Sequence, residues 1–511
     1  MDFHSILFAR TGQIGKTTTS DMPAFFIDLH LDQIVDAVTS GREEYDLKPF
    51  FYAPLTDVDS IAYRHEVIRD LENLVLFGRI NAFAQNMRTV RKQLAHAEKL
   101  HYPHQKKRWL LDAIELYCDA VSRLACDLTS ADMKSRGFIA FRTYLTGYTA
   151  SDRFNSLSAE TTKLVARLAE IKYCVLIKGD AVTVRKYESE QDYSAEVEET
   201  FRKFRQDSTK DYRVDFPDTV EMNHIEAQIL DFVARLYPEI FSDLDGYCAR
   251  NGNFMDDTTA VFDREIQFYF AWLEHVAPFK RAGLQFCYPQ VSDRHKEIRS
   301  HDGFDLALAR KLVGENTRVV CNNFHLDGDE RILVVSGPNQ GGKTTFARTF
   351  GQLHYLASLG CTVPGSEARL FLFDKLFTHF EKEEDIETLR GKLEEDLTRI
   401  HDILTQATPN SIVIMNEIFT STTLQDQIFL SEKIMARIVE LDALCAWVTF
   451  IDEVASSGTT TVSMVSSVVP ENPALRTYKL ERRPADGLAY AMSIAEKYRV
   501  TYDHLKKRLK A

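Results

Sequence analysis

The chain has 511 residues, of which 44% are hydrophobic and 27% charged, and its formal net charge is −13. This length predicts two or three domains, and the absence of any run of about 18 apolar residues argues against a membrane span. The acidic balance does not favour a general nucleic-acid binder, and eight scattered cysteines without a CxxC pair argue against disulfides or a zinc site.

The N-terminal segment, residues 1–45, contains a sequence that resembles a phosphate loop, "TGQIGKTTT" at residues 11–19. A true loop has the pattern G-x4-G-K-[ST], and its first glycine would fall on Arg10. We therefore predict no nucleotide site here. The same segment lacks the apolar run and cleavage site of a secretory signal, which favours a cytoplasmic protein.

Residues 46–304 have the apolar spacing of a mainly α-helical region. The basic stretch at residues 88–111 is interpreted as a solvated helix face, with nucleic-acid contact as the alternative. One interruption lies near residues 170–220, where β-rich sequence flanks Lys178-Gly179-Asp180 and predicts a hairpin insertion. The charged stretch that follows is expected to be exposed.

From residue 305 to residue 511 the pattern changes to short apolar strands that alternate with helices. The strands are expected in "RILVVSG", "SIVIMNE", "LCAWVTFI", "TTTVSMVSSV" and "RTYKLERRP". Alternation of this kind is typical of an α/β domain whose sheet is buried on both faces.

A phosphate loop in the correct context follows the first of these strands. Gly337, four further residues and Gly342-Lys343-Thr344 satisfy the motif, with an apolar strand before it and a helical pattern after it. Lys343 is expected to reach the β and γ phosphates, and Thr344 to hold Mg²⁺. The predicted phosphate-binding residues are Gly337, Pro338, Asn339, Gln340, Gly341, Gly342, Lys343, Thr344 and Thr345.

The strand at residues 412–415 should lie beside the phosphate-loop strand and deliver Asn416 and Glu417 to the site. In ATPases of this kind the first position is an acid that contacts Mg²⁺ through water, and the second accepts a proton from the attacking water. Asn416 keeps an oxygen but loses the charge, whereas Glu417 keeps the base. A competent but slow ATPase is favoured, and a nucleotide-binding switch without turnover stays open.

The motifs "SGPNQGGKTT" and "IVIMNEI" resemble those of the MutS family of DNA mismatch-repair ATPases, within the wider ABC class. The likeness continues through residues 357–380 and in "DGLAYAMSIAEKYRVTYDHLKKR" near the end, and more loosely through residues 46–73. It implies an ABC-type P-loop ATPase domain at residues 305–511 after a helical core or lever domain at residues 46–304. The hairpin then corresponds to a clamp-like insertion.

The resemblance also implies roles for single residues. Val319 falls where the family has an aromatic that stacks on adenine, and Asn322 matches a family asparagine. Gly391 aligns with the signature serine that reaches the partner subunit's γ-phosphate, and residues 421–426 match a loop at the dimer seam. Phe450 stands where the family has a switch histidine.

By this resemblance the protein is expected to be a homodimer that moves its helical arms as ATP binds at composite sites. No Phe-x-Glu wedge occurs in the first hundred residues, so a short form without the mismatch-recognition domain is predicted. Three functions remain open: an ATPase that acts on DNA without mismatch recognition, an ATP-driven switch that engages a protein partner, and a nucleotide-binding dimer with little turnover.

Overall fold

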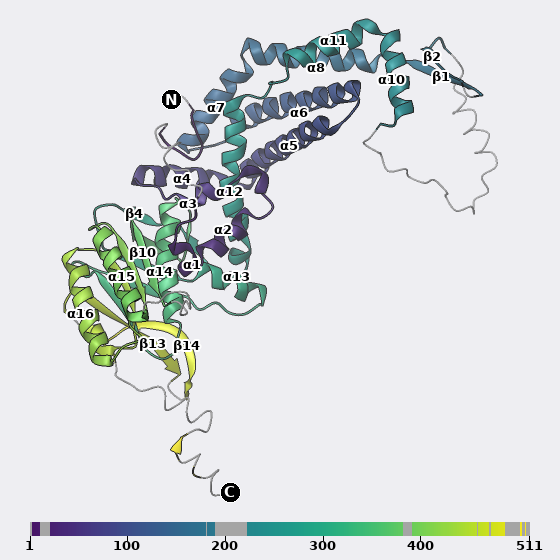
Figure 1. Cartoon of the computed structure of the whole chain (residues 1–511). Helices are drawn as coiled ribbons and strands as arrows, with labels where there is room; N and C mark the ends of the chain where they lie inside the picture. Colours follow the sequence, from purple (N-terminus) through teal and green to yellow (C-terminus); the bar gives the residue numbers. More distant parts are fainter. Residues whose placement is uncertain are drawn as a thin grey trace, which may run out of the picture. The chain divides into compact units, whose positions relative to one another are not determined.

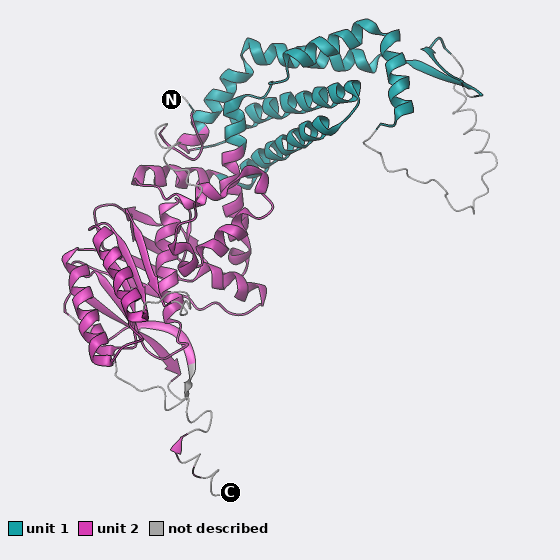
Figure 2. Ribbon diagram, viewed as in Figure 1, with its two compact units in different colours: residues 1–3, 71–133, 139–263 teal, residues 4–70, 134–138, 264–511 magenta. Residues whose placement is uncertain are grey.

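The computed structural model describes residues 3–10, 21–179, 181–189, 222–381, 391–456, 458–469, 472–485, 501–502 and 506. The chain folds into two compact units, shown in Figure 2. The first comprises residues 1–3, 71–133 and 139–263, and the second comprises residues 4–70, 134–138 and 264–511. These units group residues by packing, so the boundaries predicted at residues 45 and 304 stay predictions.

The first unit is built from long helices, labelled in Figure 1. They are α5 (Leu74–Lys99), α6 (Pro103–Ser130), α7 (Arg136–Thr149), α8 (Asp152–Ala169), α10 (His224–Leu236), α11 (Pro238–Arg250) and the start of α12 (Asp257–Arg281). Residues 136–138 of α7 and residues 264–281 of α12 belong to the second unit. Local sequence starts several of them, because Asn73, Ser151 and Asn223 accept hydrogen bonds from first-turn amides as N-caps. A stacked pair, Phe141 and Phe262 with centroids 3.6 Å apart, lies in the core.

The basic stretch at residues 88–111 lies on α5 and α6, and three of its basic side chains form ion pairs within the unit. Arg91 pairs with Asp263, Lys107 with Asp245 at 2.5 Å, and Arg108 with Asp112 at 2.7 Å. These pairs favour the interpretation of the stretch as a solvated helix face over its interpretation as a nucleic-acid surface.

The predicted hairpin is confirmed as β1 (Tyr173–Lys178) and β2 (Ala181–Lys186), which pair antiparallel with Val175 opposite Val184. Gly179 has a φ of 59°, the left-handed backbone that a tight turn needs. The hydroxyl of Tyr237, before α11, donates to the Lys172 carbonyl at 2.6 Å. Asp180 and the charged stretch at residues 190–221 lie outside the described residues, as does the false phosphate loop at residues 11–19.

The second unit is centred on a six-stranded sheet in the order β10-β11-β12-β7-β13-β14. The strands are β7 (Ile332–Ser336), β10 (Leu376–Phe380), β11 (Ile412–Asn416), β12 (Leu444–Val448), β13 (Thr461–Val469) and β14 (Asn472–Arg482). All neighbours run parallel except β14, which is antiparallel to β13. The predicted α/β fold class is thus confirmed, including the five strands foreseen in the sequence.

Helices cover both faces of this sheet (Figure 1). On one face Val413, Met415 and Trp447 pack with α15 (Lys392–Gln406) and α16 (Leu424–Glu440) in one buried cluster. On the other face Ile414 meets α14 (Lys343–Ser358) at Gly351. In β7, β11 and β12 all five residues are buried. This is expected for strands of a sheet that is covered by helices on both faces.

Smaller elements complete the second unit. A four-stranded sheet has the order β4-β9-β5-β6, and β3 pairs with β8. The strands are β3 (Phe286–Cys287), β4 (Gln290–Ser292), β5 (Ile298–Gly303), β6 (Asn322–Leu326), β8 (Val363–Pro364) and β9 (Glu367–Phe371). The helices are α1 (Phe25–Leu29), α2 (Leu31–Thr39), α3 (Lys48–Tyr52), α4 (Val58–Leu71) and α13 (Leu306–Gly314), with 3₁₀ turns at Glu43–Tyr45 and Asp452–Ser456. Within the described ranges, no helix has the length and apolarity that a membrane crossing requires.

Candidate nucleotide-binding site

The phosphate loop joins the central strand β7 to α14, with Gly342 at the helix N-cap. The structure explains why glycine stands at two positions of the motif. Gly337 has a φ of 117°, and a Cβ at Gly341 would lie 2.3 Å from the Ser466 hydroxyl of β13. That hydroxyl donates to the Gly341 carbonyl at 2.7 Å. Side chains at these positions would push the loop off the sheet, so the backbone amides could no longer curl around a phosphate.

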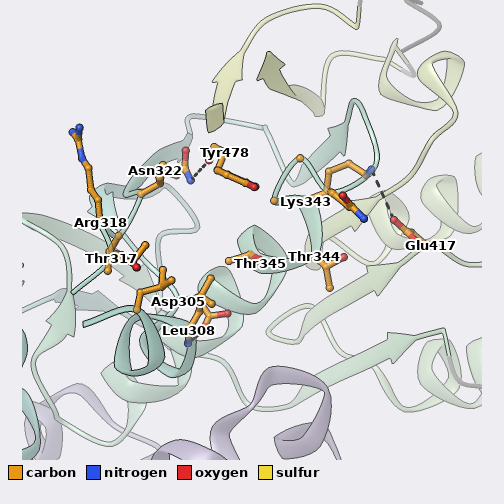
Figure 3. Close-up of a pocket in the computed structure, with 16 residues that line it drawn as sticks. Asp305, Leu308, Thr317, Arg318, Asn322, Lys343, Thr344, Thr345, Glu417 and Tyr478 are labelled. Atoms are coloured by element: carbon orange, nitrogen blue, oxygen red, sulfur yellow. Dashed lines mark hydrogen bonds and ion pairs between the residues drawn. The ribbon is translucent and has the colours of Figure 1, made fainter. Parts of the chain in front are cut away.

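A cavity of about 510 Å³ opens beside this loop and α14 (Figure 3), within the size range of small-molecule sites. The structure brings nine predicted residues to its wall: Val319, Asn322, Gln340, Gly341, Gly342, Lys343, Thr344, Thr345 and Glu417. The other predicted residues, Gly337, Pro338, Asn339, Asn416 and Gly391, are not part of the wall.

Lys343 is the centre of the site and is almost completely buried. Its Nζ donates to the carbonyls of Gly337 at 3.1 Å and Pro338 at 3.2 Å, and lies 3.9 Å from Glu417 Oε1. The Phe450 ring covers it, with the ammonium 4.0 Å from the ring centroid. Burial lowers the pKa of Lys343 to about 8, although Glu417 acts in the opposite direction. Phosphate oxygens would replace the solvation that this ammonium lacks.

Glu417 follows β11 in an unusual backbone conformation. Its φ is 54°, left-handed for a residue that is not glycine, and its amide donates to the Val448 carbonyl of β12 at 3.0 Å. Such strain persists at functional sites because the surrounding structure fixes it. Burial raises the pKa of the Glu417 carboxyl, while Lys343 lowers it. The carboxylate is therefore aimed at the phosphate loop rather than out into solvent (Figure 3).

Asn416 ends β11 and is 7% exposed. Its Oδ1 atom is buried and has no hydrogen-bond partner among the described residues. A buried oxygen of this kind fits a metal-bound water as its donor. No group of three or more His, Cys, Asp or Glu side chains in the described ranges could hold a metal by itself. The residues therefore fit Mg²⁺ that is held mainly by phosphate oxygens, with Thr344 and Asn416 at its side.

Asn322 and Tyr478 shape the far wall of the cavity. The Asn322 amide donates to the Tyr478 carbonyl at 3.1 Å and accepts from the Leu480 amide at 2.9 Å, so its side chain positions β14. Tyr478, half exposed with a φ of 59°, lies beside Gly342, and Val319 lines the same cavity. The sequence reasoning missed Tyr478, since no motif spacing marks it. The signal that could have identified it is an aromatic residue on the last predicted strand of a domain that contains a phosphate loop.

Gly391 stands apart from the cavity, as the N-cap of α15. It is exposed, has an ordinary φ of −67°, and has open space where a side chain would be. The helix that it begins is linked to the loop after Glu417. Glu381 accepts from Lys392 and from the Thr420 hydroxyl, and buried Asp396 accepts from the Phe419 amide at 3.3 Å. A role for Gly391 in a partner's site stays a prediction.

A parallel sheet with a phosphate loop after its central strand, and a carboxylate at the end of a nearby strand, defines a P-loop nucleotide-binding domain. More particularly, residues 333–501 match the family described as MutS domain V, an ATPase domain. For this part of the chain, the predicted resemblance to MutS is thereby confirmed. Such domains in general bind ATP and Mg²⁺, and proteins of the MutS family dimerise.

Several curated proteins are similar to part of the chain. "DNA mismatch repair protein MutS" of Bacillus pumilus is 30% identical over 156 residues, which are 29% of this chain and 18% of that protein. The MutS protein of Zymomonas mobilis is 31% identical over 168 residues, 32% of this chain and 19% of that protein. "DNA mismatch repair protein MSH3" of Eremothecium gossypii is 29% identical over 144 residues, 28% and 14% of the two chains. The match thus spans less than a fifth of these relatives.

Proposed function

We propose that this protein binds ATP with Mg²⁺ at the cavity beside the phosphate loop and hydrolyses it slowly. The observation that supports this most is the pair formed by Lys343 and Glu417, 3.9 Å apart, at the carboxyl ends of the parallel strands β7 and β11. A cation for the phosphates and a base for the water therefore meet at one end of the cavity. That is the arrangement which hydrolysis of a phosphoanhydride needs.

Each residue has a role in this proposal. The loop amides and Lys343 bind the phosphates, and Mg²⁺, placed beside Thr344 and Asn416, would neutralise negative charge on them. Because Asn416 is neutral, the metal should be held less tightly than by a carboxylate. Glu417 accepts the proton of the attacking water. A γ-phosphate on Lys343 would compete with the Phe450 ring, which covers the ammonium in the structure described above.

The base of the nucleotide is proposed to lie against Tyr478. Val319 offers a small apolar contact, whereas the half-exposed Tyr478 ring supplies the aromatic surface that Val319 lacks. Stacking of a base on an aromatic ring contributes on the order of 1–3 kcal/mol. Tyr478 would thus supply the adenine contact that the sequence assigned to Val319.

We further propose that the protein works as a homodimer with composite sites, in which Gly391 of one subunit faces the nucleotide of the other. DNA is the proposed object of its helical arms, by analogy with relatives named as DNA mismatch-repair proteins. Mismatch recognition is not part of the proposal. A protein partner, or a dimer with little turnover, is the alternative, and a cytoplasmic location remains a prediction.

Turnover and nucleotide binding of three variants test the proposed activity. We expect Lys343→Ala to abolish ATP binding and Glu417→Gln to keep it while turnover falls by roughly 10²–10⁴-fold, the usual contribution of a general base. Glu432→Gln, an exposed change on α16, is the matched control and should leave both properties unchanged. If the wild type turns ATP over no faster than Glu417→Gln, the protein binds nucleotide but is not an ATPase.

A further inference from the structure

A second cavity, of about 340 Å³, lies in the same unit and is separate from the nucleotide cavity. Helices α2, α12 and α13 supply its wall, chiefly through Gln33, Ile34, His275, Leu306, Arg310 and Lys311. The α13 residues recur at the spacing of one helix face, whereas Leu308 and Leu312 of the same helix line the nucleotide cavity. One helix therefore separates two cavities.

The wall of this second cavity is positively charged. Arg310 and Lys311 contribute two cations, and no carboxylate belongs to the wall. Acids on or beside the surrounding helices are already paired: Asp36 with Lys48 at 2.6 Å, Glu274 with Arg42 at 2.7 Å, and Asp305 with Arg348 at 2.8 Å.

The two cations themselves have no such compensation. Asp32, at the start of α2, and Glu315, directly after α13, are not in the wall either. Within the described ranges, the side chains of Arg310 and Lys311 form no ion pair or hydrogen bond, and both residues are exposed. Their charges are available to an anion.

His275 adds an unsatisfied polar atom. Its Nε2 is buried and has no hydrogen-bond partner among the described residues. Burial lowers the pKa of His275 to about 4, and Arg310 acts in the same direction, so the ring is neutral at neutral pH. Aromatic neighbours hold it in place, with the Phe279 centroid 5.5 Å and the Trp272 centroid 6.1 Å away. In one tautomer Nε2 would donate a hydrogen bond to a ligand oxygen.

We propose that this cavity is a binding site for a small phosphate-bearing anion, held by Arg310 and Lys311 and by a hydrogen bond from His275. Gln33 offers a further amide, and Ile34 and Leu306 give apolar contact to the rest of such a ligand. Its volume suits a phosphate ester as well as free phosphate. The proposal does not depend on ATP hydrolysis, because it uses none of the residues of the nucleotide site.

Phosphate binding to a chain with a disabled phosphate loop tests this site. Calorimetry and Trp272 fluorescence would follow titration of the full-length Lys343→Ala variant with inorganic phosphate and, separately, with AMP. We expect saturable binding of at least one of them. Tighter binding of AMP would identify an ester as the ligand, and equal binding would identify the phosphate group alone.

Further substitutions in that background identify the site. Arg310→Ala with Lys311→Ala should weaken binding by about tenfold or more, as expected when charge-assisted contacts are lost. His275→Phe, which keeps an aromatic ring but removes the donor, should weaken it less. The control pair Arg123→Ala with Lys163→Ala removes two exposed cations from α6 and α8. Absence of saturable binding, or equal weakening by the control pair, would overturn the proposal.

Discussion

Lys343 carries the charge that a bound triphosphate would meet, and its surroundings make that charge sensitive to pH. Burial outweighs the attraction of Glu417, so the pKa of Lys343 falls to about 8 from the ordinary 10.5. The folded chain therefore releases this proton at a lower pH than the unfolded chain. Below pH 8 the buried charge destabilises the fold, and this contribution declines as pH rises.

ATP affinity is predicted to decrease as pH rises through 8. The neutral lysine loses its attraction for phosphate, and with a pKa of about 8 the charged fraction falls roughly tenfold between pH 7 and 9. Calorimetric titration with ATP at pH 7, 8 and 9 measures the change. Lys343→Arg serves as the control, because a guanidinium stays charged and its weaker binding should not vary. A constant affinity in the wild type would show that Lys343 keeps its proton in the free protein.

Local spacing predicted which residues of the motif would come together, but not the residues around them. Lys343, Thr344 and Glu417 do line one cavity, because a phosphate loop and a strand-end acid have fixed local spacing, while their roles stay predictions. Tyr478 was missed, and so was the contact between Phe450 and Lys343, because both depend on β12 and β13 pairing with β7, more than 100 residues earlier in the chain. Asn416 was assigned correctly to the end of its strand, but its unpartnered oxygen is visible only after folding.

Among the elements, α15 is linked to the loop that follows the candidate base Glu417. Its first residue, Lys392, pairs with Glu381, which also accepts from Thr420 in the loop after Glu417. Farther along, Asp396 bonds His379 at 2.9 Å as well as the Phe419 amide. A phosphate at the start of α15 would therefore be sensed by the loop that carries the base.

Two substitutions at Gly391 test whether this helix start faces a partner's nucleotide. Serine and aspartate both cap helices well, and the open space at Gly391 accepts either. The free energy of unfolding should therefore change by less than about 1 kcal/mol. Serine can donate to a γ-phosphate, whereas aspartate repels it. We expect Gly391→Ser to keep or raise ATP turnover and Gly391→Asp to lower it by about tenfold or more. Equal turnover of the two variants would show that Gly391 does not face the nucleotide.

At the scale of the whole molecule, local pattern predicted the order of elements but only part of the sheet architecture. Long amphipathic helices, the hairpin and the buried strands of the central sheet all have strong periodic signals. The sheet β4-β9-β5-β6 was not predicted, because its strands are short and polar, as in "IRSHDG", and pair with distant segments. Its stability comes from tertiary pairing rather than from its own sequence.

The proposed DNA binding must use local basic surfaces, because the chain as a whole carries a formal charge of −13. The hairpin offers one, with Lys178, Arg185 and Lys186 all exposed. We predict that the full-length chain binds duplex and forked DNA at 50 mM salt, more weakly at 200 mM, without preference for a mismatch.

Replacing Lys178, Arg185 and Lys186 with alanine should weaken DNA binding uniformly and lower the salt slope by about one for each phosphate contact removed. The exposed pair Arg123 and Lys163, changed to alanine, is the control for loss of charge elsewhere in the same unit. Fluorescence anisotropy with duplex, mismatched, forked and single-stranded DNA at both salt concentrations, with and without ATP, separates the alternatives. If none of these DNAs binds at 50 mM salt, DNA is not what the helical arms act on, because an electrostatic contact is strongest at low ionic strength.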